Sequence, residues 1–490
     1  MRDANFGIPS KFEIRHSSFA IMRAAFRVFH LLSYLTFRLG VWFIRLLPLD
    51  CAFLIGKGGG ELAYRVLFNR RALALSNLRL AFGGEMSESE LQALNRKHFQ
   101  LLGANLLAGF KASTLSHEKI WERITAEIPE RPQTTGWIAL ISHLGNWELY
   151  SHLGQKFPEY RFGAIYQTVA NPFIDQYMRA ERAKAGIALF DRRSELLGCV
   201  RFLREGGAVG VLIDQGAGYS GLWSPLFGRL TSSSTLPARL AIRTGLPVVP
   251  LAINTIGRAR WKLTASAPFY PATEDPELLT AQINRLLEEQ IRRAPADWLW
   301  AHNRWKPLRP HFLLSRNVRP VFLPPDFDRS MLDPFRVLIV SPTPAENAEA
   351  IMPGVRAIKQ GRPDNWLGVL ANDETVRVWK HSEIADAVLE WRNDESVLNI
   401  ASKIRAAGFD VAIFFDHTLK VALAVRIAKI PIRVGFRSAP NSWLYNQHPR
   451  EPNQSLDPRA MSLYLAQSVG AAINGPIQQA ARYHAAHPTI

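Results

Sequence analysis

The chain has 490 residues, which is too long for one ordinary hydrophobic core, so two or three domains are expected. Hydrophobic residues make up 47% of it and charged residues 21%, values that exclude an intrinsically disordered protein. The net charge of +17 indicates an anionic partner. Because the sequence has no Lys/Arg-rich run interleaved with aromatic residues and no zinc-finger spacing, nucleic acid is not the expected one. An anionic membrane surface, an acidic carrier protein and a phosphorylated lipid fit the charge equally well.

The N-terminal segment, residues 1–60, is expected to associate with a membrane. Four arginines interrupt its apolar stretch, so it contains no clean run of about 20 apolar residues: Arg23, Arg27, Arg38 and Arg45. On a helix these arginines share one narrow face, and the opposite face carries apolar side chains: Phe26, Leu32, Leu35, Leu39, Trp42 and Phe43. A basic stripe on an apolar helix is typical of a segment that lies in, or tilts across, a membrane interface. The alternative is an amphipathic helix that is buried within the domain itself.

Residues 61–310 are expected to form an α/β domain. Its first part, residues 61–125, is predicted to be helical, with a helix start at residues 87–90. From residue 136 on, apolar runs alternate with helical segments, which favours a largely parallel sheet. The predicted strands are residues 137–142, 161–166, 208–213 and 248–253. Helices are predicted near residues 147–156, 171–186, 194–205 and 234–244.

His143 follows the first of these strands and is the candidate general base. A Gly145-Asn146 turn comes next, and Glu148 begins the following helix. A histidine paired with a carboxylate can remove the proton of a hydroxyl that attacks a carbonyl. Because ligands bind beyond the carboxyl ends of the strands in open α/β sheets, His143 is well placed for that chemistry. We expect Glu148 to fold back onto the second ring nitrogen of His143; the other interpretation is a structural histidine at a strand end.

The spacing of this pair has little value by itself. His117 and Glu122 have the same spacing, and so do His381 and Asp386. With 13 His and 42 acidic residues in 490, about one such pair is expected by chance. The other two pairs lie in charged or polar segments with no strand before the histidine, so we interpret them as surface residues.

Several ordered sequence blocks single out the His143 pair. They are residues 143–148, residues 166–186 with Arg182 and Gly186, residues 206–215, residues 225–228, residues 246–250 and residues 298–306. Arg71, Asn77 and Leu78, together with the apolar N-terminus, add to them. Over about residues 20–310 the chain resembles the lipid A late acyltransferases, the lauroyl/myristoyl transferase family of Gram-negative envelope synthesis. This resemblance implies a glycerolipid-acyltransferase-like α/β domain.

The resemblance also implies an activity. It is that of an O-acyltransferase, which moves a fatty acyl group from acyl-carrier protein to a hydroxyl of a lipid A precursor or related glycolipid. His143 is then the general base, and Glu148 sets its tautomer. The expected substrate-binding residues are Arg182, Asp214, Gln215 and Asn146. Three of these have a plainer alternative: a salt bridge within the fold for Arg182, a helix cap for Asp214 and a turn for Asn146.

The expected place of this activity is the cytoplasmic face of the bacterial inner membrane. Acyl-carrier protein, a glycolipid acceptor and the membrane surface are then its partners, and neither a cofactor nor a metal is expected. The two cysteines, Cys51 and Cys199, are too few for a disulfide framework and indicate a reducing compartment. One alternative is acylation of another glycolipid or of an aminolipid. The other is a non-catalytic envelope-assembly or glycan-binding protein that retains the fold. The acyl-chain length depends on a pocket lining that the sequence does not place.

The C-terminal third is expected to be a separate unit. Residues 311–334 are proline-rich and form the predicted linker, residues 335–470 form a second α/β domain, and residues 471–490 form a tail. Strands are predicted at 336–340, 367–370, 411–415 and 433–436, with helices near 349–360, 396–407 and 418–428.

Blocks at residues 335–340, 409–416 and 431–436 resemble the heptosyltransferases of lipopolysaccharide core synthesis. This resemblance implies a Rossmann-like half-domain of the family 9 (GT-B) type. The Gly-Asp pair of that family falls here on Glu346-Asn347, and an asparagine side chain cannot accept the proton that the family's aspartate takes. We therefore expect a degenerate half-domain that recognises a glycan, docks a partner or serves as a scaffold.

Overall fold

The computed structural model describes residues 11–473 except 129, 131, 133, 135 and 316–320, with side chains from residue 26 onward. The predicted tail lies outside the described residues from residue 474 on. The chain divides into two compact units. Unit 1 holds the residues up to 215 and residues 234–304, and unit 2 holds residues 216–233 and those from 305 on. The predicted domains are continuous segments, whereas these units are not, because residues 216–233 pack with the C-terminal part of the chain.

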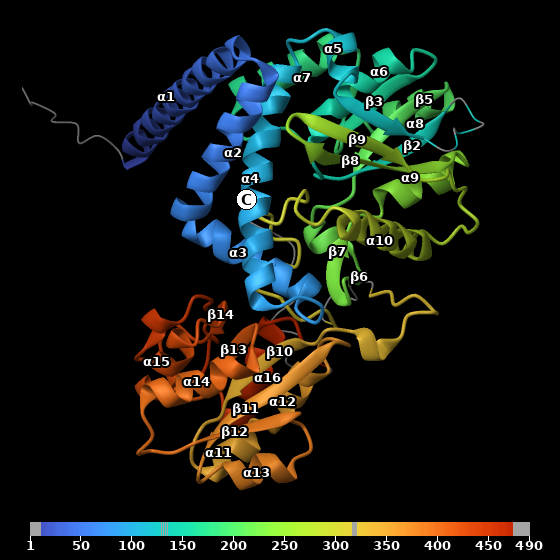
Figure 1. The fold of residues 1–490 in the computed structure, drawn as a ribbon. Helices are drawn as coiled ribbons and strands as arrows, with labels where there is room; N and C mark the ends of the chain where they lie inside the picture. The colour runs from blue at the N-terminus through green and yellow to red at the C-terminus, as the bar shows by residue number, and fades with distance from the viewer. Residues whose placement is uncertain are drawn as a thin grey trace, which may run out of the picture. The chain divides into compact units, whose positions relative to one another are not determined.

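Unit 1 begins with a group of helices. They are α1 (Lys11–Leu46), α2 (Leu49–Val66), α3 (Phe68–Phe82), α4 (Glu88–Ala112) and α5 (His117–Trp121). Helices α2 and α4 lie side by side (Figure 1) because glycines let their backbones meet. A Cβ on Gly60 would overlap the carbonyl of Phe99, and one on Gly56 would overlap that of Gly103. Helix α4 begins as predicted, with a capping box between Ser87 and Glu90.

A seven-stranded sheet in the order β1-β9-β8-β2-β5-β3-β4 forms the centre of unit 1. The strands are β1 (Ile124–Glu127), β2 (Trp137–Ile141), β3 (Arg161–Tyr166), β4 (Ala188–Asp191), β5 (Gly207–Leu212), β8 (Val248–Gly257) and β9 (Arg260–Ala265). Every pair of neighbours is parallel except β8 and β9. The four strands predicted from sequence form β2, β3, β5 and β8, so the α/β fold is confirmed. Strands β1, β4 and β9 are not predicted from the sequence. Strands β1 and β4 have four residues each and lie at the sheet edges, so they are too short for a clear period, whereas β9 buries alternate residues and its signal was missed.

Helical segments connect these strands and cover the sheet (Figure 1). They are the 3-10 helix η1 (Trp147–His152), α6 (Leu153–Lys156), α7 (Pro172–Lys184), α8 (Leu196–Arg204), α9 (Leu236–Thr244) and α10 (Pro276–Arg293). The side chain of Asn171 accepts hydrogen bonds from two backbone N–H groups at the start of α7, and Pro172 stands at its first position. Helix α7 therefore has a fixed start, and this matters because it carries Arg182.

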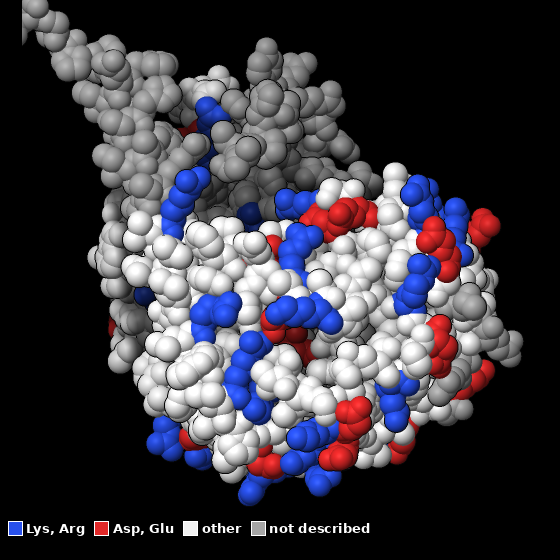
Figure 2. Space-filling model, turned by 90° about the horizontal axis from the view of Figure 1, so that it is seen from above, with Lys and Arg blue, Asp and Glu red and all other residues white. Residues whose placement is uncertain are grey.

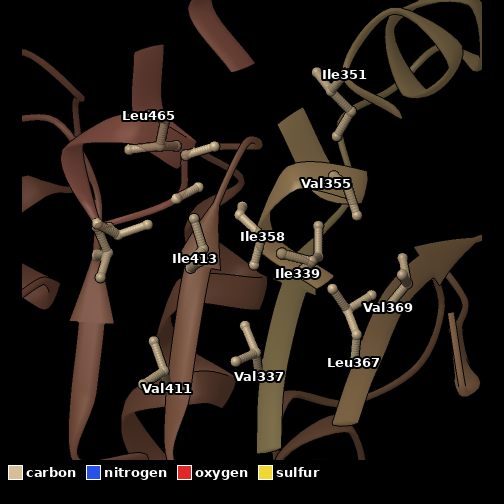
Figure 3. Packing of buried hydrophobic residues seen from close by; sticks show 14 of the residues in the cluster. Val337, Ile339, Ile351, Val355, Ile358, Leu367, Val369, Val411, Ile413 and Leu465 are labelled. Atoms are coloured by element: carbon tan, nitrogen blue, oxygen red, sulfur yellow. The ribbon is translucent and has the colours of Figure 1, made fainter. Parts of the chain in front are cut away.

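Unit 2 is built on a five-stranded parallel sheet in the order β12-β11-β10-β13-β14. The strands are β10 (Phe335–Val340), β11 (Asn365–Asn372), β12 (Ala387–Trp391), β13 (Val411–Phe414) and β14 (Ile432–Val434). The helices are α11 (Ala345–Ala350), α12 (Met352–Lys359), α13 (Val376–His381), α14 (Val397–Ala407), α15 (Leu419–Ile427) and α16 (Pro458–Ser468). Val337 and Ile339 of β10 enter the core on one face (Figure 3), whereas Leu338 and Val340 enter that on the other. Burial on both faces is typical of a Rossmann-like sheet, as predicted.

A hairpin of strands β6 (Leu222–Leu226) and β7 (Arg229–Ser233) also belongs to unit 2. Its Trp223 and Leu230 pack against Leu314. The buried guanidinium of Arg229 lies 2.9 Å from the carboxylate of Asp333 and 2.7 Å from that of Asp410. Residues far apart in the sequence thus hold this hairpin.

Helix α1 packs Arg38 and Arg45 against helix α7 and turns its apolar side outward. The Arg38 guanidinium lies 4.7 Å from the ring centre of Tyr177 on α7, and Arg45 pairs with Glu181 on the same helix. The side chains of the predicted apolar face are more than half exposed: Phe26, Leu32, Leu35, Leu39, Trp42 and Phe43. The apolar face of α1 is therefore exposed, and the alternative of a helix buried within the domain is not found. Among the helices that the structure describes, none combines the length and apolar character that crossing a bilayer requires.

Candidate active site

The register of strands β2 and β5 brings His143 and Asp214 together. Ile141 and Leu212 are partners in the sheet, and His143 and Asp214 stand two residues beyond them at the carboxyl ends. The ring Nδ1 of His143 lies 2.9 Å from one carboxylate oxygen of Asp214, and the His143 backbone N–H donates to the other at 2.8 Å. Two contacts fix the imidazole against this carboxylate, so its orientation is set by the sheet.

Asp214 also accepts a hydrogen bond from the sequence block of residues 298–306. The indole N–H of Trp298 donates to Asp214 at 3.0 Å, and the backbone N–H of Leu299 donates to the His143 carbonyl at 3.1 Å. The Asn77 side chain in turn donates to the carbonyls of Trp300 and His302, both at 2.8 Å. Three of the blocks that carried the sequence resemblance therefore meet at one place in the fold.

Burial and charge oppose each other in this pair. Burial lowers the pKa of His143, but the charge of Asp214 and the hydrogen bond to it outweigh burial and raise that pKa above its usual value. Burial raises the pKa of Asp214, but the charge and hydrogen bonds of His143 lower it overall, so the carboxylate stays ionised. A neutral imidazole that donates from Nδ1 to a carboxylate keeps the lone pair of Nε2 for accepting a proton. The pair has the arrangement of a general base and its orienting carboxylate.

Glu148 does not bond to the Nδ1 of His143 as we expected, because Asp214 occupies that position. The Oε1 of Glu148 instead lies 3.3 Å from the Arg182 guanidinium. Glu148 stands on the short helix η1, where the neighbouring Trp147 ring packs edge-on against His143 with ring centres 5.1 Å apart. His143 and Asp214 are far apart in the sequence, so spacing along the chain does not show their contact.

Arg182, a predicted substrate-binding residue, lies at the pocket of His143. It projects from α7, pairs with Glu148, and its guanidinium lies 5.3 Å from the ring centre of Tyr166. His143, Glu148, Arg182 and Gln215 line the same pocket. Arg182 therefore forms the salt bridge of the plainer alternative and also lines the pocket, because its partner Glu148 is itself a pocket residue.

Asn146 takes no part in this pocket lining. It is buried, and its side chain lies close to Gly109 on α4. The preceding Gly145 has a φ of +57°, and a Cβ there would run into the carbonyl of Ile253. These two residues form the turn that delivers His143, which agrees with the turn alternative for Asn146.

The pocket has a volume of about 430 Å³ and two distinct ends. One end carries His143, Glu148, Arg182 and Gln215. The other runs over the sheet and is lined by apolar residues: Ala139, Phe162, Ala164, Leu189, Gly210 and Leu251. A charged end next to a long apolar one suits a substrate with a reactive head and a hydrocarbon tail.

The two other His-x4-acid pairs lack this setting. The Nδ1 of His381 bonds to the Arg377 carbonyl of its own helix at 2.7 Å, and Asp386 pairs with Lys359. His117 lies beside His152, with ring centres 5.6 Å apart, at the start of α5. His381 is exposed, in keeping with its interpretation as a surface residue, whereas His117 is half-buried and its Nδ1 is shielded from solvent.

Comparison with known proteins places the chain. A family model described as bacterial lipid A biosynthesis acyltransferase matches residues 24–307, more than half of the chain. The chain belongs to that family. Membership makes it an acyltransferase, as the sequence blocks predicted. The sequence resemblance over about residues 20–310 is thereby confirmed.

Curated relatives agree with the family. The chain is 27% identical over 287 residues to a lipid A biosynthesis lauroyltransferase of Escherichia coli (strain K12), covering 56% of this chain and 92% of the relative. It is 26% identical over 282 residues to a lipid A biosynthesis palmitoleoyltransferase of the same organism, covering 55% and 90%. A lipid A biosynthesis acyltransferase of Haemophilus influenzae is 24% identical over 265 residues, covering 51% and 83%. The two Escherichia coli relatives differ in the acyl group that their names give.

A solved structure is similar to part of the chain. It is a glycosyl transferase family 9 protein from Veillonella parvula DSM 2008, with 12% identity and a TM-score of 0.26. The match covers 29% of this chain and 42% of that protein. Within unit 2, Asn347 lies in the first turn of α11, and its side chain donates at 3.0 Å to the carbonyl of Thr343, which precedes that helix.

Proposed function

We propose that this acyltransferase moves a fatty acyl chain from acyl-carrier protein to a hydroxyl of a lipid A precursor or related glycolipid, at the cytoplasmic face of the inner membrane. One observation carries the proposal: the His143–Asp214 pair opens into a pocket that is charged at one end and apolar along the sheet. The apolar part suits the acyl chain of the donor thioester. The charged part suits the acceptor hydroxyl and its surroundings.

In this mechanism Nε2 of His143 takes the proton of the acceptor hydroxyl as its oxygen attacks the thioester carbonyl. A C–O bond forms and the carbonyl oxygen becomes an oxyanion. Asp214 stabilises the imidazolium that results, because it is buried and ionised. The C–S bond then breaks, and the imidazolium returns its proton to the leaving thiolate of the carrier protein.

Arg182 is the cation of this pocket that suits the developing oxyanion or an acceptor phosphate. Glu148 holds the Arg182 guanidinium at 3.3 Å. We assign Glu148 to the positioning of Arg182, in place of the orientation of His143 expected from sequence. Gln215 lines the same pocket beside Asp214 and is a further hydrogen-bonding group for the acceptor.

Helix α1 supports a membrane surface as the place of action. Apolar side chains are exposed along it from Phe26 to Leu46 and make up an apolar strip, and large exposed apolar patches mark interaction sites. Figure 2 shows Lys and Arg side chains over the face seen from above, with Asp and Glu between them. The net charge of +17 favours an anionic lipid surface. A lipid acceptor and a lipid-binding strip on one unit fit a single interfacial reaction.

The test is acyl transfer from acyl-carrier protein thioesters to a tetra-acylated lipid A precursor, with purified full-length protein and product detection by mass spectrometry. We expect turnover by the wild type and a loss of at least about 10²-fold in His143→Ala. Absence of wild-type turnover on any glycolipid would contradict the proposed acceptor class. Turnover on an aminolipid alone would move the acceptor to the second class considered from sequence.

A further inference from the structure

The apolar half of the pocket exists because three neighbouring strands carry small residues at the same level. Ala139 of β2 is the register partner of Gly210 of β5, which in turn is the partner of Ala164 of β3. All three line the pocket. A row of side chains no larger than a methyl group leaves a trough over these strands, and such a trough fits a hydrocarbon chain that runs along them toward their amino ends.

The next row of residues closes this trough. Two positions toward the amino ends of the strands, the register partners are Trp137, Ala208 and Phe162. The rings of Trp137 and Phe162 meet edge to face, with centres 6.0 Å apart and planes at 90°. Phe162 lines the pocket, so its ring stands where the trough ends.

A second apolar cavity lies beyond this ring. It has a volume of about 40 Å³ and is lined by Trp137, Phe157, Tyr160, Val249 and other apolar residues. Three residues line both cavities: Leu153, Phe162 and Leu251. They form a wall one side chain thick, and Phe162 is its largest member.

We propose that Phe162 is the residue that sets the length of the acyl chain this enzyme accepts. The chain lies over Ala139, Gly210 and Ala164, and its methyl end stops against the Phe162 ring. This inference rests on the proposed acyl transfer, because it assigns the apolar half of the same pocket to the donor chain. The accepted acyl length then depends on the row of side chains that contains Phe162.

The experiment offers an equimolar mixture of capryl, lauroyl, myristoyl and palmitoyl thioesters of acyl-carrier protein to one lipid A precursor, and product lengths are read by mass spectrometry. Phe162→Leu and Phe162→Ala open the wall into the second cavity. We expect the preferred chain to lengthen by at least one two-carbon step, with a change of about tenfold in the ratio of kcat/KM values between adjacent lengths. The alanine variant should shift further than the leucine variant.

Two further variants test the inference: one should shift the preferred length in the opposite direction, and one is a matched control. Ala164→Leu fills the trough before the wall and should shorten the preferred chain, so it answers the question even where Phe162→Ala fails to fold. Phe157→Leu makes the same change as Phe162→Leu in a residue that lines only the second cavity, and it should leave the length distribution unchanged. If the wild type is active and the Phe162 and Ala164 variants keep its length distribution, the inference is wrong. If the wild type transfers no acyl chain, the proposed function fails instead.

Discussion

The two units place different residues at the same position of a parallel sheet. In unit 1, His143 and Asp214 stand two residues beyond the register partners Ile141 and Leu212. In unit 2, the last register partners of the adjacent strands β10 and β13 are Val340 and Phe414, and the residues two positions beyond them are Pro342 and Asp416. A proline ring has no group that exchanges a proton. The two sheets therefore present different residues at the ends of these strands: a histidine and an aspartate in unit 1, and a proline and an aspartate in unit 2.

The other polar groups near this end of the unit 2 sheet bond to one another. The Trp379 indole N–H donates to Ser341 at 2.7 Å, which fixes the residue that directly follows β10. The Tyr445 hydroxyl donates to Asn441 at 2.7 Å and lies 3.1 Å from Nδ1 of His417. Burial lowers the pKa of His417. These bonds stabilise loops, whereas the corresponding groups of unit 1 face a pocket.

The largest expected effect separates the two sheet ends directly. Removing the imidazole by His143→Ala should lower kcat by about 10²–10⁴-fold or more, because proton transfer from the acceptor hydroxyl loses its base. Asp416→Ala removes the equivalent carboxylate position of unit 2 and should leave kcat within about twofold of the wild type, by the same argument. Steady-state kinetics on both variants, with far-ultraviolet circular dichroism as the folding control, decides between them. A large loss in Asp416→Ala would mean that the unit 2 sheet end takes part in the chemistry.

The next prediction separates the two carboxylates near His143. Asp214 raises the pKa of His143, so the rate should fall as the pH drops through that raised value and the imidazole becomes protonated. Asp214→Asn removes this charge, which should lower the pKa of His143, move the acid limb of kcat/KM to lower pH and reduce kcat by about 10²–10⁴-fold.

Glu148→Gln is the matched carboxylate-to-amide change. It leaves the Nδ1 contact of His143 in place and releases Arg182, so KM for the acceptor should rise and the acid limb should move less than in Asp214→Asn. A larger movement of the acid limb in Glu148→Gln would restore Glu148 as the orienting residue predicted from sequence.

Most sheet strands could be predicted because an apolar run bounded by turn residues is a local signal. Strands β2, β3, β5 and β10 show this signal clearly. His143 and Gln215 could be placed at one site because each follows such a strand, whereas Arg182 was placed there by the resemblance of its sequence block to the family. The pairing of His143 with Asp214 could not, because it requires that β5 lie next to β2, and β3 and β4 separate these strands in the chain. The hydrogen bond from Trp298 to Asp214 could not be predicted either, because these residues are also far apart in the chain. Residues 216–233 follow β5 directly, and only their contacts assign them to unit 2.

A third prediction concerns how unit 2 holds this hairpin. Arg229→Met keeps the length of the side chain but leaves Asp333 and Asp410 without their cation. Because both carboxylates are partly exposed and can regain water, we expect a loss of about 2 kcal/mol in the free energy of unfolding of unit 2. Lys403→Met breaks the pair of Glu395 with Lys403, a cation far more exposed than Arg229, and should cost less than about 1 kcal/mol. Urea unfolding of the full chain measures both.

Equal losses in Arg229→Met and Lys403→Met would mean that the hairpin does not depend on its buried ion pair. The same contact governs any truncation near residue 330. Such a truncation removes both carboxylates that Arg229 binds and the whole five-stranded sheet. Loss of activity in that truncated chain would therefore report on the hairpin as well as on docking.

The smallest expected effect compares exposed leucines of the two units. Leu39 on α1 is 65% exposed and Leu398 on α14 is 68% exposed. Leu39 lies in the apolar strip of α1, so Leu39→Glu should weaken binding to anionic vesicles about tenfold, because one leucine loses its burial in the interface. Leu398→Glu adds the same charge to unit 2 and should leave the binding unchanged. Co-sedimentation with anionic and neutral vesicles measures both, and equal weakening by the two variants would show that net charge, and not the apolar strip of α1, holds the protein on the surface.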